Sequence, residues 1–141
     1  MVKSLRDRIA RFINFINSGD KTIGKEVVSE SAVFHVPFGG EPLKGLGGYK
    51  QMLGMMLSAY PDIQWFLEEA VVEKDVFVAR FKISGTHQGK FLGFRASGRQ
   101  VRSQAMNIYR FADGKIVEER WLPDIFGMLV QIGAIAVPGP Q

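Results

Sequence analysis

The sequence contains no cysteine, which excludes disulfide bridges and thiol chemistry. It also lacks any apolar run of the roughly 20 residues that a membrane-spanning helix needs. The start of the chain is charged and amphipathic, and it does not have the pattern of a secretory signal peptide. We therefore expect a cytoplasmic protein with no membrane partner.

Histidine is scarce, with only 2 residues in the chain. His35 and His87 lie far apart in the sequence, and neither has a carboxylate at ligand spacing, so the sequence predicts no metal site. There is no phosphate-binding loop and no dinucleotide-binding glycine motif. The segment Ala96-Ser97-Gly98 is not the nucleophile elbow of a serine hydrolase.

The net charge of +4 raises the question of nucleic-acid binding. The basic residues are scattered along the chain, and their densest group lies between Arg95 and Arg102. No helix-turn-helix, zinc-finger or ribonucleoprotein motif accompanies them. We therefore expect a solvated basic surface and no nucleic-acid partner.

Hydrophobic residues make up 46% of the 141 residues, which suits one compact domain spanning residues 1–141. Apolar residues recur at helical spacing in some segments and alternate in others. Helices are predicted over residues 5–18, 20–28, 45–60 and 124–132, strands over 32–36, 63–73, 76–85, 100–111 and 115–121, and an extended tail over 134–141. Helices that precede a mostly antiparallel sheet are typical of the α+β class. A curved sheet with helices across one face forms a cone with room for a small-molecule pocket.

Asp124 stands at the junction between the last predicted strand and an apolar helix. A carboxylate in such a place, followed by large apolar residues, is a candidate for a buried acid or base. The same position suits an N-cap, in which the carboxylate accepts hydrogen bonds from backbone N–H groups, and Pro123 fits that helix boundary. The two roles are compatible, so both stay open.

The two histidines are candidates for polar contacts inside a pocket. His87 follows an alternating strand in phase with its more apolar face, so we expect its imidazole to point inward, where it could donate to a carbonyl or shuttle a proton. The alternative is a strand-end histidine bonded to a nearby backbone group. His35 lies on a short strand before Pro37, where it either lines the pocket or simply ends the strand.

Several large side chains are candidates for the wall of a pocket that holds a flat apolar ligand, although such residues more often form plain core. They are Met52, Met55, Met56, Trp65, Phe91, Phe94 and Trp121. Asn107 is a polar residue in the middle of a predicted strand. If it faces inward it needs a partner, and a ligand oxygen is one candidate.

Five segments between residues 45 and 133 carry the motifs of a known family. They are Tyr60-Pro-Asp62, Gly85-Thr-His-Gln-Gly-Lys-Phe-Leu-Gly93, Ser97-Gly98, Tyr109-Arg-Phe-Ala-Asp-Gly-Lys-Ile-Val-Glu118, and Asp124 with Gln131-Ile-Gly133. Together they resemble the SnoaL-like polyketide cyclases, also called ester cyclases, of the nuclear-transport-factor-2-like superfamily. The resemblance implies a cone-shaped α+β barrel, in which N-terminal helices pack on the concave face of a curved, mostly antiparallel sheet.

The resemblance also implies an activity, namely the intramolecular aldol ring closure of a small hydrophobic or polycyclic polyketide ester. In that family the aspartate after the last strand is the general acid/base. Asp124 matches it, and His87 would assist. The substrate's own carbonyl groups stabilise the enolate, so no metal or organic cofactor is required. The resemblance further implies a homo-oligomer, a dimer or tetramer, assembled through the outer face of the sheet.

Other functions stay open because folds of this kind carry many activities. The main alternative is a protein that binds a hydrophobic small molecule without converting it. An isomerase, dehydratase or hydrolase on the same fold is another, and a dimerisation module is a third. The segment His35-Val-Pro-Phe-Gly-Gly40 offers no carboxylate where a steroid isomerase usually has its general base.

Overall fold

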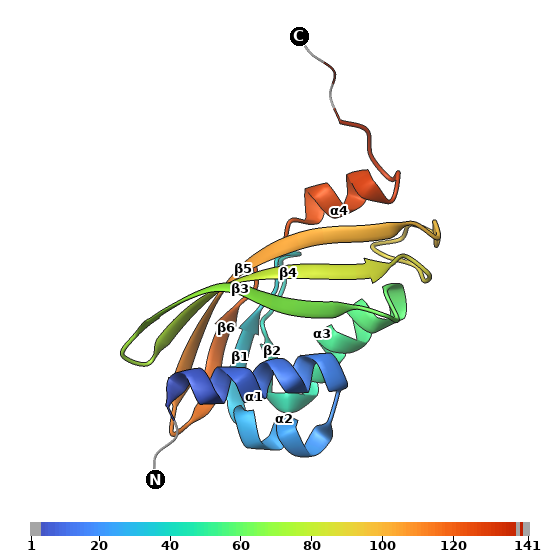
Figure 1. Cartoon of the computed structure of the whole chain (residues 1–141). Coiled ribbons are helices and arrows are strands. Elements are labelled where there is room, and N and C mark those ends of the chain that lie inside the picture. Colours follow the sequence, from blue (N-terminus) through green and yellow to red (C-terminus); the bar gives the residue numbers. More distant parts are fainter. Residues whose placement is uncertain (1–3, 138, 140–141) are drawn as a thin grey trace.

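The computed structural model describes residues 4–137 and 139. These residues contain four helices and six strands (Figure 1). The helices are α1 (Leu5–Ser18), α2 (Lys21–Val27), α3 (Gly45–Ala59) and α4 (Ile125–Gln131). The strands are β1 (Val28–His35), β2 (Leu43–Lys44), β3 (Gln64–Glu73), β4 (Val76–Thr86), β5 (Gln100–Ala112) and β6 (Lys115–Arg120). The strands form one sheet in the order β2-β1-β6-β5-β4-β3. Only β1 and β6 pair in parallel; the other neighbours are antiparallel.

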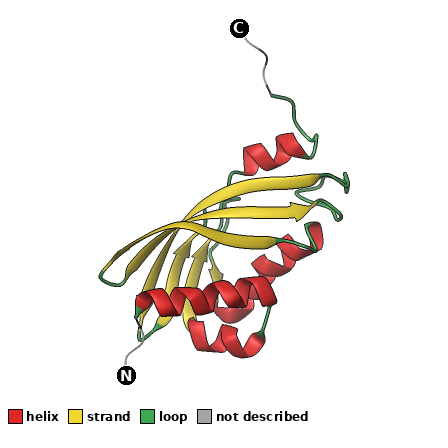
Figure 2. Ribbon diagram, in the orientation of Figure 1, coloured by secondary structure: helices red, strands yellow, loops and turns green. Residues whose placement is uncertain are grey.

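Helices α1, α2 and α3 lie on one side of this curved sheet, and α4 lies on the other side beside β5 (Figures 1 and 2). Aromatic side chains fill the space between the three helices and the sheet. Phe12 of α1 packs against Tyr49 of α3 and Tyr109 of β5, with ring centroids 5.6 and 5.2 Å apart. Phe34 of β1 contacts the same Tyr49 ring at 4.4 Å. Burial of such rings supplies much of the driving force that closes the helices onto the sheet.

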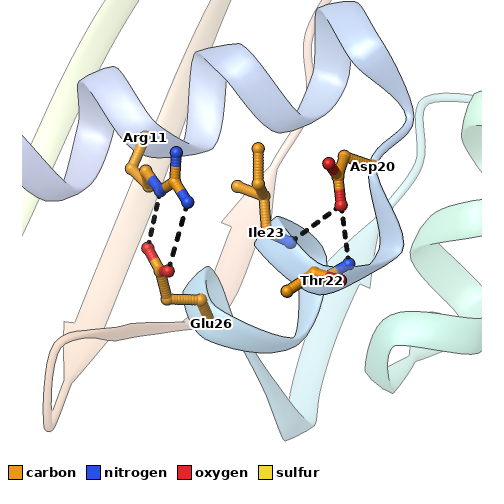
Figure 3. Close-up of polar contacts among 5 residues, drawn as sticks. All are labelled: Arg11, Asp20, Thr22, Ile23 and Glu26. Carbon is orange, nitrogen blue, oxygen red and sulfur yellow. Dashed lines mark hydrogen bonds and ion pairs between the residues drawn. The ribbon is translucent and has the colours of Figure 1, made fainter.

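Polar contacts fix the corner between α1 and α2 (Figure 3). The Asp20 carboxylate caps α2 by accepting hydrogen bonds from the backbone N–H groups of Thr22 and Ile23, at 2.8 and 3.3 Å. Arg11 of α1 forms an ion pair with Glu26 of α2, with 2.8 Å between Nε and Oε2. The two helices therefore hold a defined angle as they cover the sheet.

A β-bulge near the start of β6 decides which of its side chains face the core. Phe111 of β5 pairs with Ile116, whereas the preceding Arg110 pairs with Glu118, so Val117 is an extra residue on β6. Strict alternation from Ile116 would turn Glu118 inward and Glu119 outward. The bulge reverses this pattern: Ile116 and Glu119 are both buried, and Glu118 is partly exposed.

The α+β class predicted from the sequence is confirmed, as are all four helices and five of the strands to within a few residues. Two details differ. Strand β1 begins at Val28 and not near residue 32, because the chain passes directly from α2 into the sheet. Strand β2 was not predicted, because two residues carry no periodic signal. Residues 134–137 contain no helix or strand, and part of the predicted extended tail lies outside the described residues. Across the described ranges, no helix is long and apolar enough to cross a bilayer.

Candidate functional site

A narrow cavity lies between the helices and the inner face of the sheet. Its wall is mainly apolar and aromatic, with a few polar groups that converge on one side. The lining residues are Ile16, Tyr49, Met52, Leu53, Met56, Trp65, Asn107, Tyr109, Glu119 and Trp121. The cavity volume is only about 10 Å³. That is room for about one water molecule, so the lining side chains almost close the cavity.

The carboxyl group of Glu119 is the most unusual group in this wall. Its side chain is only 1% exposed although glutamate is almost never fully buried without an ionic partner. Burial raises the pKa of Glu119 to about 8, and hydrogen bonds from Tyr49 and Tyr109 oppose that rise. The carboxyl group is therefore mostly protonated at neutral pH, but it can lose its proton at little cost. Such a group in a cavity is a candidate acid or base.

Tyrosine and asparagine side chains hold Glu119 in a connected polar network. The hydroxyl of Tyr49 donates to Oε1 of Glu119 at 3.2 Å, and Tyr109 also hydrogen-bonds to the carboxyl group. Asn107 donates from Nδ2 to the Tyr109 hydroxyl at 3.0 Å and accepts at Oδ1 from the Leu122 backbone N–H at 3.1 Å. Every member has a defined partner, so the network fixes the position of the carboxyl group.

Five of the residues considered for the pocket wall meet in this cavity: Met52, Met56, Trp65, Asn107 and Trp121. Asn107 faces inward, and its amide is satisfied by protein groups. Met55 and Phe94 are exposed instead, at 37% and 40%.

His87 and Phe91 lie in a separate buried cluster around Tyr60. The His87 ring points inward, as its position one residue after β4, in phase with the apolar face of that strand, predicted; the residue is fully buried. Its ring centroid is 5.6 Å from that of Tyr60, and the Phe91 centroid is 5.2 Å from Tyr60 on the other side. His87 Nδ1 accepts a hydrogen bond from the backbone N–H of Ser97 at 3.1 Å, which fits the alternative of a strand-end histidine bonded to the backbone.

His35 and Asp124 lie nearer the surface and do not line the cavity. His35 is half-buried, with its Nε2 3.2 Å from Oε2 of Glu118. Asp124 is exposed and caps α4, because its carboxylate accepts the Gly127 backbone N–H at 2.8 Å. The capping role is therefore present, whereas the catalytic role of Asp124 stays a prediction.

Glu119 was missed in the sequence because simple alternation along residues 115–121 puts it on the solvent side. The bulge at Val117 is a property of the pairing between β5 and β6 and leaves no mark in β6 alone. One local signal was available. Glu119 is two residues before Trp121, so a strand that buries the indole also buries this glutamate.

The sequence pattern of the SnoaL-like polyketide cyclases matches residues 6–132. The chain therefore belongs to that family. It is 27% identical over 134 residues to the aklanonic acid methyl ester cyclase DnrD of Streptomyces peucetius, a match that covers 90% of this chain and 89% of the relative. It is also 26% identical over 90 residues to a nogalonic acid methyl ester cyclase of Streptomyces nogalater, which covers 63% and 67% of the two chains.

The fold has close counterparts among solved structures. The crystal structure of wild-type IdmH from Streptomyces antibioticus superposes with a TM-score of 0.84 at 28% identity, covering 93% of this chain and 99% of that chain. TsrD from Streptomyces laurentii gives a TM-score of 0.83 at 25% identity, covering 96% and 100%. These similarities confirm the fold that the sequence motifs implied.

Proposed function

We propose that this protein catalyses the cofactor-independent intramolecular aldol ring closure of a polyketide-type ester, with Glu119 as the proton carrier. The observation that carries the proposal is a buried carboxyl group with a pKa of about 8 in the wall of an apolar cavity. Membership of the polyketide cyclase family supports the reaction class, and two relatives are named as methyl ester cyclases.

The chemistry requires one group that takes a proton and returns it. Ionised Glu119 removes a proton from a carbon flanked by two carbonyl groups of the substrate. The resulting enolate carbon attacks a second carbonyl carbon and forms the new C–C bond. The alkoxide that develops takes the proton back from Glu119, so the product is an isomer of the substrate. A carboxyl group with a pKa near the working pH suits both halves of this cycle.

The surroundings of Glu119 fit this role. Tyr49 and Tyr109 hold the carboxyl group from two sides, so it needs little reorganisation when its charge changes. Trp65 and Trp121 supply apolar walls that exclude water from a reactive enolate. The cavity is almost closed, so binding requires side chains to move, and Met52 and Met56 are the flexible part of the wall.

Asp124 offers a competing assignment, since it matches the catalytic aspartate that the resemblance implied. The test compares wild type, Glu119→Gln and Asp124→Asn with aklanonic acid methyl ester as the trial substrate, and follows ring closure by liquid chromatography. We expect Glu119→Gln to lower kcat about 10²- to 10⁴-fold, the usual size of general acid–base catalysis. Asp124→Asn keeps a good helix cap and should retain most of the activity.

A large loss of kcat in Asp124→Asn, with little loss in Glu119→Gln, would assign the proton transfer to Asp124. A wild-type protein that binds the ester tightly but never cyclises it would support the alternative of a binding protein.

We also propose that a second copy of the chain covers the outer face of the sheet, as the family resemblance implied. Val71, Val78 and Ile108 pair across β3, β4 and β5 and form a continuous apolar row. Their side chains are 62%, 38% and 39% exposed. An apolar row of this kind on a sheet surface is typical of an interface.

A further inference from the structure

Two polar atoms in the interior, on side chains whose rings lie close together, have no hydrogen-bond partner among the described residues. They are the hydroxyl of Tyr60 and Nε2 of His87, both buried. The two rings contact each other, with 5.6 Å between their centroids. Buried polar groups are nearly always paired, and an unpaired one costs stability. Two such groups in one cluster therefore need an explanation, and a ligand is one.

The tautomer of the neutral His87 ring follows from the contacts of Nδ1. Nδ1 accepts the Ser97 backbone N–H at 3.1 Å and lies 2.9 Å from Ser97 Oγ. That oxygen accepts the Arg99 backbone N–H at 3.3 Å, so its own proton is available for Nδ1, and Nδ1 carries the lone pair. The proton of the neutral ring is then on Nε2. The Tyr60 hydroxyl also has a proton to donate. The cluster thus holds two donors and lacks an acceptor.

Backbone contacts hold the two donors in a rigid frame. The N–H groups of Gln88 and Gly89 both donate to the Ala59 carbonyl, at 3.0 and 3.1 Å, and tie the segment after β4 to the end of α3. A side chain at Gly89 would collide with the Ser58 carbonyl oxygen, so only glycine permits this approach. The relative position of Tyr60 and His87 is therefore set by the main chain.

The cluster lies at the C-terminal end of α3, the helix that also contributes to the cavity wall. Met52 and Met56 line the cavity at successive turns of α3, and Tyr60 caps the helix four residues after Met56. Its N–H donates to the Met56 carbonyl at 2.8 Å, so Tyr60 follows Met56 by one turn. A ligand that displaces the Met56 side chain would extend towards the two donors.

We propose that the Tyr60 hydroxyl and the Nε2–H of His87 form a carbonyl-binding site, in which both donate to one ketone or ester oxygen of a ligand held in the cavity. This inference rests on the proposed function and deepens it. Glu119 would handle the proton at one end of the substrate, while Tyr60 and His87 would fix a carbonyl at the other end. The site would then select substrates with a carbonyl oxygen at that distance from the reacting carbon.

The test uses two probes that differ in one carbonyl oxygen: the bicyclic ketone 1-tetralone and the hydrocarbon tetralin. Binding of each is measured by NMR titration of wild type and Tyr60→Phe. The phenylalanine variant keeps the ring that packs against His87 and Phe91 and removes only the hydroxyl. Tetralin serves as the matched control, because it keeps the bicyclic frame and lacks only the carbonyl oxygen.

We expect Tyr60→Phe to weaken tetralone binding about 2- to 10-fold, the effect of one neutral hydrogen bond, and to leave tetralin binding unchanged. The melting temperature of free Tyr60→Phe should stay the same or rise, because the substitution removes an unpaired buried hydroxyl. Nitrogen-15 NMR should place the His87 proton on Nε2, and tetralone should shift that Nε2–H signal downfield.

Three results would overturn the site. They are a proton on Nδ1 of His87, a lower melting temperature for free Tyr60→Phe, or tetralone binding that Tyr60→Phe leaves unchanged or that is absent altogether. A lower melting temperature would mean that a structural water already satisfies the hydroxyl. None of these measurements depends on ring closure, so they can disprove the carbonyl-binding site while Glu119 remains the proton carrier. The reverse also holds, since a catalytically silent Glu119 would leave carbonyl binding intact.

Discussion

The hydroxyl of Tyr49 donates to Oε1 of Glu119 at 3.2 Å inside the core. These residues are 70 positions apart and come from α3 and β6, so their contact exists only in the folded protein. It joins the helical layer to the sheet at the wall of the cavity. The hydrogen bond lowers the pKa of Glu119 while burial raises it, and burial has the larger effect. The fold thus sets the protonation state of its most buried carboxyl group.

The two adjacent glutamates of β6 should affect stability in opposite ways as the pH changes. In the unfolded chain Glu119 ionises near 4.5, whereas its pKa in the folded protein is about 8. Between these values the folded state keeps a proton that the unfolded chain has released. The stabilisation linked to Glu119 is therefore complete below pH 4.5 and falls by about 1.4 kcal/mol per pH unit as the pH rises towards 8.

Urea denaturation at several pH values between 5 and 8 measures this effect. Glu119→Gln has no titrating group and should remove the fall. Glu118→Gln is the matched control, because a hydrogen bond from His35 and the charges of Arg120 and Arg110 lower the pKa of Glu118. Glu118 contributes stability above its unfolded pKa and loses it only at acidic pH, so this variant should keep the fall between pH 5 and 8. An unchanged slope in Glu119→Gln would contradict the account.

Substitutions at Asp124 should separate capping from catalysis. Asp124→Ala removes the acceptor for the Gly127 N–H and should cost about 1 kcal/mol of unfolding free energy, the usual effect of a lost N-cap. Asp124→Asn retains an acceptor and should cost much less. Chemical denaturation at neutral pH compares the two variants. Equal stability of Asp124→Ala and wild type would show that the cap contributes nothing.

If copies of the chain associate through the apolar row on the outer face of the sheet, a charge introduced into that row should separate them. Val78→Lys puts a charge in the middle of the row that Val71 and Ile108 flank, and it should convert an oligomer into a monomer. Gln51→Lys adds the same charge at an exposed position of α3 and should leave the assembly intact. Sedimentation velocity measures the masses. A wild-type protein that is monomeric at micromolar concentration would rule out the interface.

Most of the fold was predictable because its signals are local. Helical and alternating periodicities mark the long elements, and the alternation of β4 correctly places Phe77 and His87 on the inner face. Ser4 and Asp7 form a capping box at the start of α1 through two reciprocal hydrogen bonds, and this contact too depends only on residues three apart in the sequence.

The site was less predictable because its decisive features depend on contacts between distant segments. The inward turn of Glu119 depends on the register between β5 and β6, and its raised pKa depends on burial beneath α3. Asp124 is a candidate from its local sequence because it follows a strand and begins an apolar helix, but whether its side chain faces the cavity depends on how α4 packs against the sheet. Five residues named from the sequence line the cavity, and the carboxyl group of Glu119 beside them was left out.

The most direct test of the central claim is the pKa of the Glu119 carboxyl group, measured by carbon-13 NMR titration with Glu119→Gln to assign the signal. We expect a pKa of about 8, and a higher pKa in Tyr49→Phe, which lacks one of the hydrogen bonds that favour the ionised form. A value near or below 4.5 would contradict the claim, because Glu119 would then be an ordinary ionised carboxylate with no proton to return at neutral pH.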